Sequence, residues 1–308
     1  MQRITNNMMV NDLIRTLNER MRSLNDLQQQ LSSGKQVFYA SDDPAAAGLI
    51  LELRSHLSQN SQFQENVQSG VNWLGSTESV IQQLNDILTQ ARADAVEGSN
   101  SALGAEAMAD LANEVDSYLE NIFALANDQY SGKYMFGGTN TNTSPFIATR
   151  DPVTDQITAI IANPDGTTGS VMRQVGSSES IQINIAGAEL FQPDGSGGSE
   201  DMFQVLINLR NALQAGDVDL VGETITQIDT VMDTTSAFAS LAGSRVTRLT
   251  NLQSSLLFKE TALTGQLSEK EDADLVELMT DMTLEQNAYQ VALNVGSMVI
   301  QPSLADFL

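Results

Sequence analysis

The chain is organised around the stretch that begins Leu275-Val276-Glu277-Leu278 and ends Val299-Ile300. Its apolar residues return at alternating steps of three and four, which is the period of an amphipathic helix. The apolar face consists of Leu275, Leu278, Met282, Tyr289, Ala292 and Val299, and it is broadened by Leu293 and Ile300. No neighbouring segment offers a matching face, so we expect this helix to need a partner from elsewhere in the chain.

The matching pattern lies at the other end of the chain. There Val10, Leu17, Leu24 and Leu31 are seven residues apart, with Leu13 and Leu27 between them, as in a heptad repeat. Residues 1–35 carry five Lys and Arg against three carboxylates, whereas residues 271–308 carry seven carboxylates and no Lys or Arg. Opposite charge favours pairing, although exposed pairs contribute little each.

We therefore predict that the two terminal helices form an inner coiled coil through which the chain assembles. The predicted assembly interface comprises Val10, Leu13, Leu17, Leu24, Leu27, Leu31, Leu275, Leu278, Met282, Tyr289, Leu293, Val299 and Ile300.

Helix boundaries can be predicted along the first third of the chain. The heptad spans residues 5–33 and is followed by Gly34, a residue typical of helix C-termini. Asp43-Pro44 is a strong helix start, because the carboxylate accepts an unpaired N–H and proline presets the first helical dihedral angle. The helix that follows should run to about Glu97.

Helices also dominate the later parts of the chain. A stripe from Met108 to Leu125 predicts a second helix of a hairpin, and another helix is expected over Phe203–Leu213. After a turn at 215–217, one stripe continues from Ile225 to Leu267. Three polar residues interrupt that stripe and are expected to fix its register: Thr235, Gln253 and Glu260.

Residues 131–199 have a different character, since Gly, Thr, Ser and Pro accumulate and strands are expected. Ile157–Ala162 and Val171–Val175 read as strands on either side of a hairpin loop near Pro164-Asp165-Gly166. Ile181, Ile183 and Ile185 alternate with polar residues, as in a half-buried strand. Gly195-Ser196-Gly197-Gly198 reads as a flexible link.

The predicted fold is mainly α with a small inserted β domain, in which the N- and C-terminal parts form a long antiparallel coiled-coil rod. Three domains are expected. The terminal helices, 1–44 with 271–308, form the inner coiled coil; 45–130 with 200–270 form a helical rod domain; and 131–199 form the small β-rich outer domain.

The composition excludes several classes of function. A formal net charge of -24 disfavours nucleic acid and anionic membranes as partners. There is no Cys, and His56 is the only histidine, so the familiar zinc and Cys-His sites are excluded. No phosphate-binding loop, cleavable signal peptide or segment long enough to span a bilayer is visible. We find no catalytic, cofactor-binding or metal-binding residues, and we expect no cofactor and no enzyme activity.

Four motifs resemble the bacterial flagellin family. They are Ala40-Ser41-Asp42-Asp43-Pro44-Ala45-Ala46, Asn72-Trp73-Leu74 with Thr77-Glu78, Tyr134-Met135-Phe136-Gly137-Gly138, and Asp272-Ala273-Asp274-Leu275. Within that family the opening Arg3-Ile4-Thr5-Asn6-Asn7-Met8-Met9 is more similar to the proteins of the hook-filament junction than to flagellin. Trp73, the single tryptophan, is expected to pack within the subunit or to contact a second subunit.

The resemblance implies a secreted structural subunit of the bacterial flagellum, located at the hook-filament junction and cytoplasmic before export. It would self-associate in a ring or tubular lattice between hook-associated protein 1 and flagellin. A type III export chaperone would bind it, at the C-terminal helix. The alternatives are a flagellin filament subunit, a secreted membrane-active translocator, for which no long apolar hairpin is present, and an enzyme that uses carboxylates alone.

Overall fold

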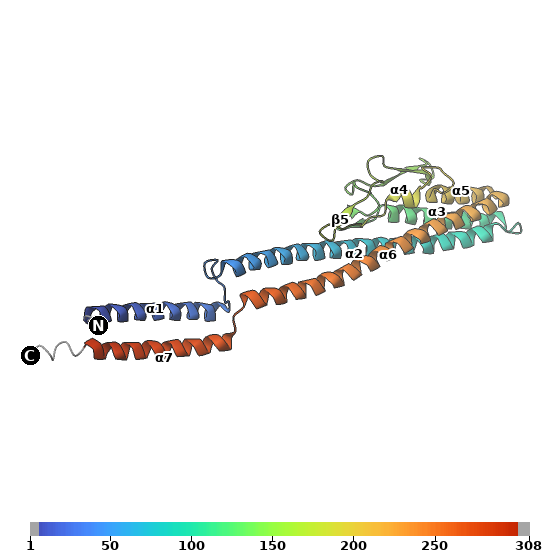
Figure 1. The fold of residues 1–308 in the computed structure, drawn as a ribbon. Coiled ribbons are helices and arrows are strands. Elements are labelled where there is room, and N and C mark those ends of the chain that lie inside the picture. The colour runs from blue at the N-terminus through green and yellow to red at the C-terminus, as the bar shows by residue number, and fades with distance from the viewer. Residues whose placement is uncertain (1–5, 301–308) are drawn as a thin grey trace, which may run out of the picture. The chain divides into compact units, whose positions relative to one another are not determined.

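The computed structural model describes the backbone of residues 6–300 and the side chains of residues 8–298. The chain divides into two compact units, one formed by residues up to 60 together with residues from 258 onward, and the other by residues 61–257. The helices, coloured by chain position in Figure 1, are α1 (Asn6–Ser33), α2 (Pro44–Gly98), α3 (Ala105–Ala126), α4 (Gly187–Phe191), α5 (Met202–Ala215), α6 (Val218–Glu271) and α7 (Leu275–Ile300). This confirms the mainly α fold and most of the predicted helix bounds. Thr5, the predicted start of the first helix, lies outside the described residues.

In the first unit α1 and α7 lie side by side (Figure 1). The two helices are antiparallel. Arg20 of α1 contacts Glu285 of α7, and the backbone of Lys35, just after α1, forms an antiparallel β-bridge with that of Asp272, just before α7. The predicted pairing of the two ends of the chain is therefore confirmed.

Aspartate side chains cap the N-termini of α2 and α7. The Asp43 carboxylate accepts from the N–H groups of Ala45 and Ala46, both at 2.9 Å, which confirms the predicted cap of α2. Asp274 caps α7 in the same way, since its Oδ1 accepts from the N–H of Val276 at 2.9 Å. Gly34 ends α1 with φ +70°, a conformation in which glycine carries no steric penalty.

The second unit has a continuous apolar core built from four helices, which explains why their stripes follow a 3–4 period. The core includes Leu84, Leu88 and Ala91 of α2, Val115, Leu119 and Ile122 of α3, Leu206, Leu209 and Leu213 of α5, and Val221, Ile228 and Val231 of α6. Thr235, predicted as a polar seam residue, is fully buried and donates its hydroxyl to the Val231 carbonyl at 2.7 Å. Gln253 of α6 donates to Gln68 of α2 at 2.8 Å.

The β region consists of three antiparallel hairpins. β1 (Gln129–Tyr130) pairs with β2 (Lys133–Tyr134), β3 (Phe146–Arg150) with β4 (Ile157–Ala162), and β5 (Met172–Gln174) with β6 (Ser180–Gln182). The prediction of a hairpin between 157–162 and 171–175 was wrong. A turn does close at Gly166, whose N–H donates to Asn163, but β4 pairs with the preceding strand, which the sequence analysis missed.

Four phenylalanines join the β region to the helices. Phe191 of α4 stacks on Phe203 of α5 with ring centroids 5.5 Å apart, and Phe146 and Phe136 meet Phe191 edge to face. The segment 195–198, predicted to be a flexible link, is instead held by hydrogen bonds. The Gly197 N–H donates to the buried carboxylate of Asp201 at 2.8 Å.

Candidate assembly interface

The predicted interface residues of α1 form one face of the helix. Val10, Leu13, Leu17, Leu24, Leu27 and Leu31 are all half-buried. Arg20 occupies the same heptad position as Leu13 and Leu27, because it lies seven residues from each. The face is therefore apolar with one cation near its middle.

On α7 the buried face is narrower than predicted. Leu278 is buried and Met282 and Tyr289 are half-buried, and the same 3–4 register continues through Glu285, Ala292 and Gly296. Gly296 allows the two helices to approach closely, because a Cβ at that position would lie 2.6 Å from Leu13 Cδ2. Helix pairs whose contact face contains small residues pack with short interaxial distances.

Arg20 and Glu285 form an ion pair within this contact. Arg20 Nη1 lies 2.8 Å from Glu285 Oε2, and both side chains are partly buried. Neither residue belongs to the predicted interface, although the seven-residue spacing 13–20–27 is a signal that places Arg20 there. A polar pair at a coiled-coil seam position fixes the register and orientation of the helices.

The other predicted residues of α7 lie away from that face. Leu275 and Leu293 are exposed, and the side chains of Val299 and Ile300 lie outside the described part of the chain. In addition, α7 carries a second apolar stripe with heptad spacing that the sequence analysis did not separate from the first. Leu284 is 62 % exposed, Val291 60 % and Met298 71 %, and Ala288 and Val295 lie between them. We call these five residues the second face of α7.

A charged cluster connects the segment that follows α1, the helix α2 and the end of α6. The carboxylate of Glu271, at the end of α6, pairs with Lys35 after α1 and with Arg54 of α2, whose Nη2 lies 2.6 Å from Oε1. Two backbone bonds support it, since Gln36 N–H donates to the Glu271 carbonyl and Ala273 N–H donates to the Gly34 carbonyl. We call Lys35, Arg54 and Glu271 the crossing cluster.

The crossing cluster favours a charged carboxylate. Burial by itself raises the pKa of Glu271, but the hydrogen bonds and positive charges of Lys35 and Arg54 outweigh it, so that the pKa of this carboxyl lies below its usual value. The side chain of Glu271 is only 6 % exposed, whereas both cations remain partly in solvent. The cluster is therefore a structural ion network in which each group has a partner.

The described residues offer no clear catalytic centre. They contain no group of three His, Cys, Asp or Glu that could hold a metal ion. His56 is exposed and lies 3.6 Å from Glu52 on its own helix. Within residues 6–300 no helix combines the length and the hydropathy needed to cross a membrane.

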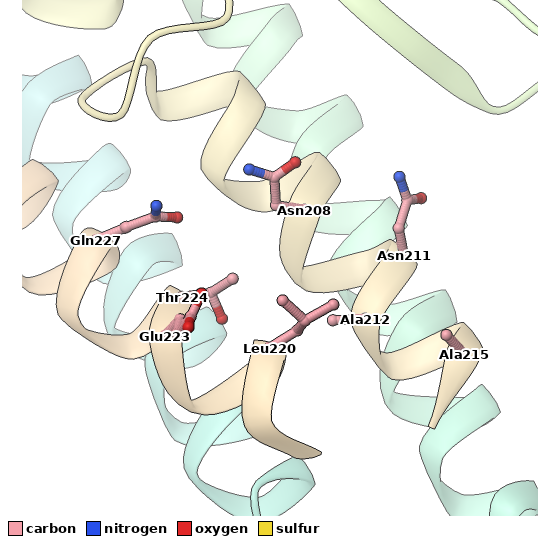
Figure 2. A pocket seen from close by; sticks show the side chains of 8 residues that line it. All are labelled: Asn208, Asn211, Ala212, Ala215, Leu220, Glu223, Thr224 and Gln227. Atoms are coloured by element: carbon pink, nitrogen blue, oxygen red, sulfur yellow. The ribbon is translucent and has the colours of Figure 1, made fainter. Parts of the chain in front are cut away.

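A cavity of about 380 Å³ between α5 and α6 illustrates the same point (Figure 2). Its polar lining comes mainly from side-chain amides, with Asn208 and Asn211 on α5 and Gln227 on α6. Glu223 is the single ionisable residue in the lining. General acid-base catalysis needs a positioned titratable group matched to a second polar group, and this cavity supplies no such pair.

Comparison with known proteins shows that the chain is similar to flagellins and to flagellar hook-associated proteins. Residues 4–141 match the family model described as the bacterial flagellin N-terminal helical region. This confirms the resemblance to the flagellin family that the sequence motifs predict.

Among curated proteins, the chain is similar to flagellar hook-associated protein 3 of Escherichia coli, with 25 % identity over 284 residues, which is 86 % of each chain. It is also similar to the flagellin of Listeria innocua, with 23 % identity over 289 residues, 92 % of this chain and 91 % of the relative.

Solved structures share the fold. A putative flagellar hook-associated protein from Vibrio parahaemolyticus matches with a TM-score of 0.65 and 19 % identity, covering 75 % of this chain and all of the other. The flagellar junction protein FlgL from Legionella pneumophila matches with a TM-score of 0.57 and 15 % identity, covering 72 % of this chain and all of the other.

Proposed function

We propose that this chain is a structural subunit of the bacterial flagellum that joins the hook to the flagellin filament. The observation that carries the proposal is the similarity to hook-associated protein 3 over 86 % of both chains. The proposed role is mechanical, adapting one tubular lattice to another, and it requires no catalysis and no cofactor.

The geometry of the terminal helices supports a role in assembly with other subunits. One face of α7 packs on α1 within the subunit, while its second face, from Leu284 to Met298, exposes large apolar side chains. A helix that is apolar on more than one side is typically buried on more than one side. The second face is therefore available for other subunits, and the predicted interface residues Leu275 and Leu293 add to the exposed apolar surface of the same helix.

The proposal includes specific partners. Copies of this chain would form a ring or tubular lattice, with hook-associated protein 1 on one side and flagellin on the other. Before assembly the chain would be held in the cytoplasm by a type III export chaperone bound at α7, since covering the second face would keep it from associating prematurely. After export it would reside outside the cell at the hook-filament junction, in contact with neither nucleic acid nor membrane.

A flagellin filament subunit is the second candidate. The similarity to Listeria innocua flagellin, which spans 92 % of this chain, favours it. The two candidates differ in cellular abundance, because a filament needs far more subunits than a junction.

A deletion in the source bacterium distinguishes them. We expect cells lacking this chain to display hooks without filaments and to release flagellin into the medium, because flagellin would be exported without a base on which to polymerise. The measurements are electron microscopy of the cell surface and immunoblots of cells and medium with an antibody against flagellin.

Expression of the wild-type chain in the deletion strain is the control and should restore filaments. Loss of filaments without released flagellin would identify this chain as the filament subunit. Unchanged filaments in the deletion strain would contradict both candidates.

A further inference from the structure

Two cations of the second unit face a small cavity without a carboxylate partner. The cavity has a volume of about 220 Å³ and lies where α2 meets the β1–β2 and β5–β6 hairpins. Lys133 of β2 and Arg173 of β5 both line it. Lys133 Nζ donates to the neutral Asn142 side chain at 2.5 Å, and among the described residues Arg173 has no ion-pair partner.

This arrangement is unusual for such an acidic chain. The sequence has 39 Asp and Glu against 15 Lys and Arg, and most of the described arginines are paired with carboxylates. Two cations that line one cavity without a carboxylate nearby favour the binding of an anion there. The cavity is therefore electrostatically suited to a carboxylate.

The rest of the lining supplies other chemistry. Ser69 of α2 and Thr139 and Thr141, which follow β2, bring three hydroxyl groups to the cavity wall. Hydroxyls can both donate and accept, so they suit ligand hydroxyls as partners. An aspartate or glutamate side chain from another protein would use the cations and leave these hydroxyls without a matching group.

Trp73 forms the aromatic part of the wall. Its ring packs edge to face on Tyr130 at 5.9 Å, and its indole N–H is buried without an acceptor among the described residues. The ring can thus reorient without breaking a hydrogen bond within the described chain. An indole beside Ile183 offers an apolar surface to the C–H face of a ligand ring.

We propose that this cavity binds an acidic monosaccharide unit, such as a uronic acid, with the carboxylate held by Lys133 and Arg173. Such a ligand has the carboxylate, the hydroxyls and the C–H face that the three parts of the wall match. The volume is below the roughly 300–1,000 Å³ of sites for drug-sized ligands, which fits a single sugar ring. The site is independent of the proposed assembly role, because all its residues belong to the second unit.

The single tryptophan makes the test direct, since all indole fluorescence comes from the wall of the cavity. The purified full chain is titrated with glucuronate and, as the uncharged ring, with glucose. We expect a saturable change in fluorescence with glucuronate and none with glucose. Arg173→Gln should weaken glucuronate binding at least about tenfold, because a charge-assisted hydrogen bond is lost.

Arg92→Gln is the matched control, because it makes the same change of charge on α2 at a residue that pairs with Asp229 outside the cavity. It should leave glucuronate binding unchanged. Equal responses to glucose and glucuronate, or binding that Arg173→Gln leaves intact, would overturn the proposal. So would a glutamate-rich peptide that changes the fluorescence where glucuronate does not, since that result assigns the cavity to a protein partner.

Discussion

At the scale of single residues, the terminal contact depends on a few polar groups in an apolar setting. Arg20 and Glu285 occupy seam positions among apolar and small residues, and Glu271 is paired with two cations. Partly buried charges need their partners, because removing one member leaves the other desolvated and unpaired. These residues can be tested one at a time.

The Arg20–Glu285 pair should show strong coupling in a double-mutant cycle. We expect Arg20→Leu alone to lower the free energy of unfolding by about 1–2 kcal/mol, because it leaves the Glu285 carboxylate without its partner. Adding Glu285→Leu should recover most of that loss. Stability is measured by urea denaturation followed by circular dichroism, and simple additivity of the two changes would contradict an interaction between them.

Glu271 should make the stability of the first unit depend on pH. Because its folded-state pKa is depressed, its contribution is fully present above the unfolded-state value of about 4.3 and is lost as the pH falls through the folded-state pKa. We expect Glu271→Gln to lower the melting temperature at pH 7 and to have little effect at strongly acidic pH. Glu269→Gln, an exposed residue of the same helix, is the control. An equal effect of Glu271→Gln at both pH values would argue against the ion network.

At the scale of elements, the helices could be predicted and the strand pairing could not. Long stripes such as Met108–Leu125 fix a helix through many repeats of one period. By contrast, β3 carries only Phe146 buried, with Ile147 exposed, so its five residues show no clear alternation and β4 was assigned the wrong partner. Short strands depend on contacts distant in sequence, here the phenylalanine cluster around Phe191.

The contact between α1 and α7 within the chain could also be predicted only in part. The heptad residues of α1 are all half-buried, but on α7 the apolar residues surround most of the helix. Periodicity alone therefore did not separate the face that meets α1 from the second face. Glu285 lies on the face that meets α1 because it pairs with Arg20, and Gly296 lies there because it gives Leu13 room. An apolar pattern does not reveal either contact.

The second face of α7 should be needed for assembly and dispensable for the fold. Val291→Asp places a charge in the middle of this exposed stripe, so the helical content of the monomer should change little while filaments are lost. Gln286→Asp adds the same charge at an exposed position outside the second face and should preserve filaments. The measurements are circular dichroism of the monomer and counts of filaments per cell in a complemented deletion strain. Normal filaments with Val291→Asp would exclude the second face from assembly.

At the scale of the whole molecule, the two units differ in how much of their surface is buried. The second unit has a continuous core with many fully buried side chains, whereas α1 is half-buried at best along its entire described length. Local stability follows the burial of apolar side chains, so the ends of the chain should open first.

Limited proteolysis of the monomer should reveal this difference. We expect early cleavage within α1 and α7 and a resistant fragment that contains residues 61–257. Mass spectrometry of the fragments over time gives the order of cleavage. Resistant ends together with a digested middle would contradict the assignment of the terminal helices as the part that assembly completes.

The antiparallel contact of α1 with α7 also determines the order of events when the chain folds. Arg20 and Glu285 are 265 residues apart along the chain, whereas the three β-hairpins of the second unit join neighbouring segments. Closing a long loop costs more entropy than closing a short one, and contacts of large sequence separation form slowly. During synthesis α1 emerges first and its partner α7 emerges last. The first helix to be synthesised is thus among the last to form its contacts within the folded chain.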